Sequence, residues 1–124
     1  MIYLENLYII ALLKCRGIGT TKLLKYVKDN DFNIARIKSN IKNLISEDDY
    51  LCFDKILEEA KYEIEFNLEK RIKLITLLDD RFPSKLYNTT DPVLYLYYRG
   101  DISLLDTPSV AVIGTRHPSD GIAD

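Results

Sequence analysis

The hydrophobic pattern of this chain changes at Lys70 and Arg71, and the change limits the folds that are open to it. Before that point, apolar residues recur every three or four positions, which is typical of amphipathic helices. After it, short apolar runs alternate with turn residues, which is typical of strands joined by short links. The sequence therefore predicts a helical domain over residues 1–70 and a mixed domain over residues 71–124.

Four helices are expected in the first domain, each indicated by its apolar spacing. They are Tyr3–Lys14, a helix capped by Thr20 or Thr21 that ends at Asn30, Phe32–Ile45 with Ser39–Asn40 as a point where it can split, and about Tyr50 to Lys70. Residues 46–49 resemble a capping box that starts the last helix. The acidic side chains of that helix are interpreted as a solvated face, because no His or Cys is interleaved among them.

The link between the first two helices, Leu13–Gly19, resembles a helix-hairpin-helix motif. Such a hairpin needs Gly17 and Gly19 because the backbone must turn sharply and approach a phosphate closely. Lys22 and Lys25 follow it and would add an attraction that does not depend on DNA sequence. The alternative is a hairpin that only packs two helices together.

Charge is distributed unevenly along the chain. Residues 1–45 hold eight Lys or Arg and three acids, a net charge of +5, whereas residues 46–124 hold nine and sixteen, a net charge of −7. A basic first part followed by an acidic remainder favours association of the first part with a polyanion. The alternative is that both sets of charges are solvated helix faces.

Neither a membrane protein nor an enzyme is expected from the remaining features. The longest apolar run, Leu7–Leu13, is too short to span a bilayer, and no signal peptide precedes it, so we expect a cytoplasmic protein. Cys15 and Cys52 lack the spacing of a metal or redox pair and are interpreted as buried, reduced thiols. His117 is interpreted as a surface turn residue, and no catalytic residue, metal or cofactor is expected.

The second domain is predicted to be α/β, which makes the whole chain α+β. Three strands are expected at Ile72–Leu78, Val93–Tyr98 and Val110–Ile113, with a short helix at Ser84–Asn88 after the first. Alternating strands and helices with short links predict a parallel, doubly wound sheet. Tyr95 and Tyr97 share one face of their strand and are interpreted as core residues.

The last strand leads into a candidate phosphate-binding turn. The apolar run Val110–Ile113 suits a strand buried on both faces and ends at Gly114. Thr115, Arg116 and Ser119 then supply two hydroxyl groups and a guanidinium at the point where a helix can begin. Free backbone N–H groups beside such side chains suit phosphate.

A series of short motifs over about residues 72–121 resembles the DprA/Smf family of DNA-processing proteins. The motifs are Asp80-Arg-Phe-Pro83, Asp91-Pro-Val-Leu-Tyr95, Tyr98-Arg-Gly-Asp101, Leu104-Leu105 and Val112-Ile-Gly-Thr-Arg116 with Ser119 and Gly121. The resemblance rests on their order and spacing. The helical first domain also fits, because many family members begin with a helix-hairpin-helix or SAM-like domain.

The resemblance implies a non-enzymatic protein that binds single-stranded DNA and helps to load the recombinase RecA during natural transformation. It also implies an extended Rossmann-like domain, a surface for self-association, and a DNA pocket at Gly114, Thr115, Arg116, Ser119 and Gly121. Asp120 departs from the family pattern, which has an aromatic residue there, and the family's domain is expected to continue beyond residue 124. The alternatives are a helical protein–protein interaction module without direct DNA binding and, more weakly, a nucleotide-binding enzyme.

Overall fold

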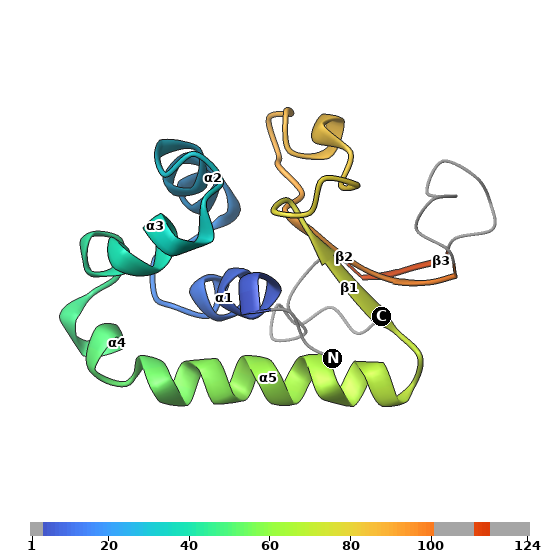
Figure 1. Cartoon of the computed structure of the whole chain (residues 1–124), viewed down its shortest axis with the longest axis horizontal. Helices are drawn as coiled ribbons and strands as arrows, with labels where there is room; N and C mark the ends of the chain where they lie inside the picture. The colour runs from blue at the N-terminus through green and yellow to red at the C-terminus, as the bar shows by residue number, and fades with distance from the viewer. Residues whose placement is uncertain (1–3, 101–110, 115–124) are drawn as a thin grey trace.

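A computed structural model of the chain describes residues 4–100 and 111–114 (Figure 1). Its helices are α1 Leu4–Leu13, α2 Thr20–Asp29, α3 Ile34–Ser39, α4 Glu47–Leu51 and α5 Phe53–Glu69, with 3₁₀ turns η1 Ile41–Asn43 and η2 Ser84–Leu86. Its strands are β1 Lys73–Thr76, β2 Tyr95–Arg99 and β3 Ala111–Gly114. Figure 1 shows α5 as the long base of the molecule, with α1 lying between α5 and α2, and with β1 above the carboxyl-terminal half of α5.

Helix α1 is covered by its neighbours, as its all-round apolar sequence predicts. Four consecutive residues, Ile9 to Leu12, are buried, so the helix has no solvent-facing side along this stretch. It packs against α5 and β1. This contact joins the helical part of the chain to the sheet.

The predicted cap of α2 is wrong, whereas its predicted end is confirmed. Thr20 already belongs to the helix, so the N-cap position falls on Gly19, and no side chain caps the first turn. Asn30 is the C-cap residue, and its backbone N–H donates to the carbonyl oxygen of Tyr26. Leu23, Leu24 and Val27 face the core.

The next helices follow the predicted spacing but break at two places. The break at Ser39–Asn40 is confirmed, since α3 ends there and η1 begins at Ile41. The single helix from Tyr50 to Lys70 is wrong, because Cys52 leaves helical geometry and separates α4 from α5. The break turns Phe53 into the core against Tyr8, with ring centroids 5.7 Å apart.

Local capping and thiol burial are partly as expected. The Ser46 hydroxyl oxygen accepts a hydrogen bond from the backbone N–H of Asp49 at 3.2 Å, which confirms the cap at this helix start. Cys15 is buried, as expected, but Cys52 is exposed, because it lies at the kink between α4 and α5. Both thiols are free.

The sheet is antiparallel, so the prediction of parallel strands is wrong for the described strands. Strand order is β1-β2-β3, Lys73 lies opposite Tyr98, and Arg99 lies opposite Ala111. A parallel pair needs a long crossover, usually an α-helix. The link from β1 to β2 contains only the 3₁₀ turn η2, so the chain folds back. The doubly wound, Rossmann-like arrangement stays a prediction.

Strand β2 is buried on both faces. Tyr95 and Tyr97 pack edge to face at 5.7 Å, which confirms that they share one face and belong to the core. Tyr98, on the other face, is also buried. The pairing with β3 shifts between Tyr97 and Tyr98, and such an irregularity bends the strand locally.

Two polar links connect helices to the sheet inside this core. The buried Thr76 hydroxyl donates to Asn6 Oδ1 at 2.8 Å. Glu63 on α5 accepts from Lys14 Nζ at 3.0 Å and from the Tyr97 hydroxyl at 2.6 Å. Burial, and then the neighbouring Glu63 carboxylate, raise the pKa of Tyr97 well above its ordinary value. Tyr97 therefore acts as a neutral hydrogen-bond donor.

The predicted domain boundary near residue 70 falls at the end of α5. Buried residues from α1, α2 and α5 form one hydrophobic cluster with buried residues from β1 and β2. Helices and sheet thus share one core in the described part of the chain. The division into domains 1–70 and 71–124 stays a prediction.

Replacing Thr76 with Val keeps the side-chain shape but removes the donor to Asn6. We expect this variant to lose about 1–3 kcal/mol of unfolding free energy, because the buried amide oxygen of Asn6 loses its partner. Urea unfolding measures the loss. The control is Ser39→Ala, which removes an exposed hydroxyl that donates to the Ala35 carbonyl and should change stability by less than about 0.5 kcal/mol. Equal effects of the two variants would contradict the importance of this link.

Candidate nucleic-acid interface

The hairpin between α1 and α2 uses its two glycines in different ways. Gly17 has φ of +73°, a left-handed conformation that favours glycine. Gly19 has φ of −95° and an extended backbone, which any residue can adopt. No atom lies within 4 Å of a Cβ added at either position. Backbone geometry therefore requires glycine at position 17 only.

An internal carboxylate already contacts this hairpin. The backbone N–H of Arg16 donates to Asp49 Oδ2 at 3.0 Å, which is the kind of contact that a bound phosphate would make. Lys14 is engaged with Glu63. These contacts give the hairpin a structural role and weigh against phosphate binding there.

The two lysines predicted to support the hairpin are both exposed on α2. Lys25 forms an ion pair with Asp29 at 3.0 Å, and both side chains are mostly in solvent, so the pair contributes little to stability. Lys22 is exposed on the same helix. DNA contact by Gly17, Gly19, Lys22 and Lys25 stays a prediction.

Of the predicted DNA pocket after the third strand, the structure places only Gly114. It is the last residue of β3 and lies opposite Tyr97. The remaining pocket residues lie outside the described residues: Thr115, Arg116, Ser119 and Gly121, together with His117 and Asp120. The sheet thus fixes where the turn begins.

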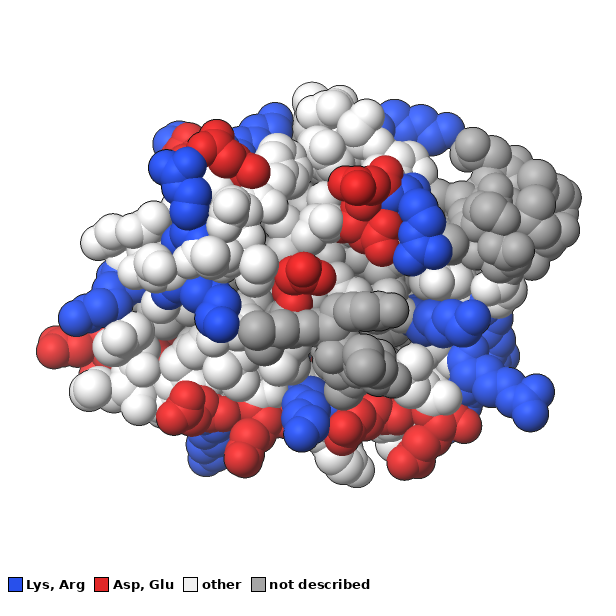
Figure 2. Space-filling view, viewed as in Figure 1, with Lys and Arg blue, Asp and Glu red and all other residues white. Residues whose placement is uncertain are grey.

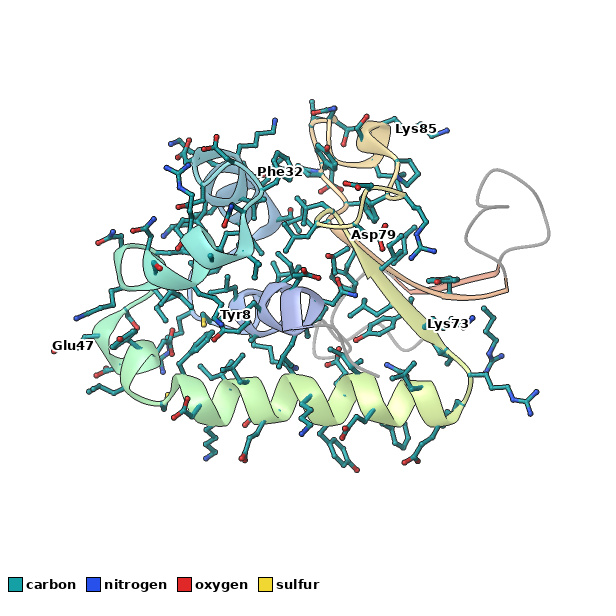
Figure 3. The ribbon with its side chains drawn as sticks, viewed as in Figure 1. Tyr8, Phe32, Glu47, Lys73, Asp79 and Lys85 are labelled. Carbon is teal, nitrogen blue, oxygen red and sulfur yellow. The ribbon has the colours of Figure 1, made fainter. Side chains whose placement is uncertain are left out.

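A cationic cleft that sequence reasoning missed lies where α5 ends and the sheet begins. Its volume is about 930 Å³, and it is lined by Leu68, Lys70, Arg71, Lys73, Arg81, Tyr98, Arg99 and Gly100. Figure 2 shows basic side chains gathered at this end of the molecule, and Figure 3 shows Lys73 at the end of β1 nearest α5. Of the eight described residues that line it, five are cations and none is an acid, so the cleft suits an anion.

Part of this cleft can be recognised in the sequence as a run of basic residues. Lys70-Arg-Ile-Lys73 is a short basic run, but the same residues mark the change from helix to strand, and the sequence pattern there predicts a boundary. Arg81 and Arg99 are far from the run in sequence. Only the antiparallel return of β2 brings Arg99 beside the start of β1.

The cleft is shaped by a backbone reversal at Arg71. The N–H of Arg71 donates to the Leu68 carbonyl at 2.9 Å, and the N–H of Ile72 donates to the Asn67 carbonyl at 2.8 Å. This is the Schellman pattern, in which the residue with positive φ is usually glycine. Here Arg71 holds φ of +64°, an unfavourable conformation for a residue with a side chain.

Contacts position two of the other cations. Arg99 Nη2 donates to the Lys70 carbonyl at 3.3 Å, which ties the end of β2 to the end of α5. Lys70 Nζ lies 4.2 Å from the centre of the Phe66 ring, a cation–π contact.

Arg81 differs from the others because an acid accompanies it. Its Nε and Nη2 donate to Asp79 at 3.1 and 2.9 Å. Hydrogen bonding from the Arg81 side chain lowers the pKa of Asp79, so the carboxylate stays ionised and offsets the Arg81 charge. The excess positive charge of the cleft therefore comes from Lys70, Arg71, Lys73 and Arg99.

Neither a metal-ion cluster nor a bilayer-spanning helix is present in residues 4–100 and 111–114. No group of three or more His, Cys, Asp or Glu side chains there is arranged to hold a metal ion. None of the helices in that part of the chain combines the length and apolar character needed to cross a bilayer.

Comparison with known protein families gives a match over the second part of the chain. The model of the family described as DNA recombination-mediator protein A matches residues 73–123, which is less than half of the chain. Residues 73–123 are therefore similar to DprA/Smf-type proteins. The resemblance predicted from the motif series is thereby confirmed, and the match supports a general role in DNA recombination. No curated protein and no solved structure gives a significant match.

The DprA-type segment begins at Lys73, the first residue of β1. It therefore includes all three described strands and three of the five cations of the cleft, namely Lys73, Arg81 and Arg99. Lys70 and Arg71, from the end of α5, complete the cleft from outside the DprA-type segment.

The two hairpin glycines give a testable contrast. Gly17→Ala should lower the unfolding free energy by about 1 kcal/mol, because alanine disfavours positive φ. Gly19→Ser should raise it by a few tenths of a kcal/mol, because serine can supply the missing cap of α2. Urea unfolding measures both changes, and a loss of stability in both variants would contradict this assignment. We expect affinity for oligo-dT to be unchanged in both.

Proposed function

We propose that the chain acts as a non-enzymatic, DprA-type protein that binds single-stranded DNA in the cytoplasm. On this proposal it helps to load RecA onto that DNA during natural transformation and associates with a second copy of itself. The observation that carries the proposal is the match of residues 73–123 to the recombination-mediator family. The motif that carries the expected DNA pocket, Val112 to Arg116, lies inside the matched segment.

The position of Gly114 is consistent with such a pocket. Strand β3 lies at the edge of the described sheet and is paired with the buried strand β2, so its end is held by a rigid element. A glycine there permits close approach of a phosphate to the backbone. Arg116, two residues on, would supply a guanidinium that pairs with a phosphate or stacks on a base.

One observation favours the helical interaction module as a second candidate. Tyr62 and Phe66 on α5 are 72% and 46% exposed, and their rings stack with centroids 6.3 Å apart. They lie on the side of α5 opposite the buried Ala60 and Ile64. Exposed aromatic pairs of this kind are frequent in protein interfaces.

Fluorescence anisotropy with labelled oligo-dT at low salt tests the proposed function. We expect the full chain to bind, and Arg116→Glu to weaken binding by roughly ten-fold or more, because a phosphate contact becomes a repulsion. Lys61→Glu on the exposed face of α5 is the matched control and should change affinity by less than roughly two-fold. Absence of binding, together with a dimer in light scattering that Tyr62→Ser dissociates, would favour the interaction module instead.

A further inference from the structure

We propose that the cleft at the carboxyl end of α5 is a second DNA site, which holds the phosphate backbone of single-stranded DNA apart from the turn after Gly114. This inference rests on the proposed function and adds a part of the DNA path that the family resemblance does not assign. The cleft is lined by five cations, Lys70, Arg71, Lys73, Arg81 and Arg99.

The charge of the cleft exceeds what the fold itself requires. Within the described residues, no carboxylate forms an ion pair with Lys70, Arg71, Lys73 or Arg99. The carboxyl end of α5 carries only about half a negative charge from its backbone dipoles, which one cation balances. The remaining cations repel one another around a concave surface, and a bound polyanion would relieve this repulsion.

The backbone conformation of Arg71 also supports a binding role for the cleft. A glycine at the reversal would avoid the cost of a left-handed conformation, which a residue with a Cβ incurs. Strained residues of this kind concentrate at functional sites, where the side chain has a role that the fold alone does not explain. At Arg71, that side chain lines the cleft.

The chemistry of the lining favours phosphates over bases. Tyr98, the one aromatic residue among the described residues that line the cleft, is buried in the core, so its ring is not available for stacking. Lysine and arginine side chains instead bind phosphate oxygens without reading the base sequence. The cleft therefore suits the backbone of a nucleic acid.

The sheet sets the distance between this cleft and the predicted DNA pocket. Arg99 lies opposite Ala111, whereas Tyr97 lies opposite Gly114, so cleft and turn are at opposite ends of β3. Three residues of strand separate those ends by roughly 10 Å. That is at most about three nucleotides, since 3.4 Å is the rise per nucleotide of a strand in the stacked double helix and an extended single strand has a longer rise. One single strand can thus contact both places.

The variant Arg71→Gly, Lys73→Gln tests the cleft in the full chain. We expect its affinity for oligo-dT to fall roughly ten-fold, and the slope of log affinity against log salt to become shallower by about 1 to 1.5. The matched control is Lys55→Gln, Lys61→Gln, which removes the same charge from exposed positions of α5 outside the cleft. The control should change affinity by less than roughly two-fold.

Arg71→Gly alone separates DNA binding from a structural role. Glycine suits the left-handed position, so we expect the melting temperature to rise by roughly 2–5 °C while affinity for oligo-dT falls. If Arg71 served only the fold, its replacement would change neither the affinity for oligo-dT nor the slope of log affinity against log salt. A rise in stability with unchanged affinity would overturn the proposal.

Further results distinguish a failure of the second DNA site from a failure of the proposed function. If the wild-type chain binds oligo-dT and Arg116→Glu weakens it, but the cleft variant behaves like its control, the second site is wrong and the proposed function stands. If the wild-type chain binds no DNA at all, the proposed function itself fails. Competition by dTMP or inorganic phosphate as effectively as by oligo-dT, at equal phosphate concentration, would show a site for free phosphates and overturn the DNA-backbone assignment.

Discussion

The backbone reversal at Arg71 connects the two kinds of structure in this chain. Helix α5 ends in a Schellman pattern, and the left-handed residue sends the chain directly into β1. Because β1 starts there, it packs against both α5 and α1. The bonds from Thr76 to Asn6 and from Tyr97 to Glu63 then fix the sheet against these helices. The same reversal places Lys70, Arg71 and Lys73 at the cleft.

The distribution of charge in space differs from its distribution along the sequence. The first 45 residues carry the positive excess, yet two of their cations near the hairpin pair with acids, Lys14 with Glu63 and Lys25 with Asp29. The acidic remainder of the chain contributes all five cations of the cleft. Electrostatic attraction depends on the local concentration of charge, so the folded chain offers a positive site on the part of the chain with the negative net charge.

Helices and local contacts could largely be predicted from the sequence, because they depend on residues close together in the chain. The apolar spacing of α1 and α5, the cap at Ser46 and the shared face of Tyr95 and Tyr97 all follow from local periodicity. The break at Cys52 could not be predicted in this way, because nothing in the local sequence accounts for it.

Strand direction and the cleft could not be predicted in this way. The alternation of strands and turns is the same for a parallel crossover and an antiparallel return, and here the short turn η2 replaces the expected crossover helix. The cleft depends on that direction, because an antiparallel β2 ends beside Lys73 and so places Arg99 there. The family resemblance pointed to Arg116 and carried no information on Lys70 or Arg71.

Amide chemical-shift mapping of the full chain with oligo-dT tests the central claim, that the DNA path runs over the sheet and the end of α5. We expect the largest shifts in residues 70–73, at Arg99 and Gly100, and from Gly114 to Arg116, with a salt dependence shared by all three segments. Shifts confined to the hairpin at residues 16–22, with none in residues 70–73, would contradict it.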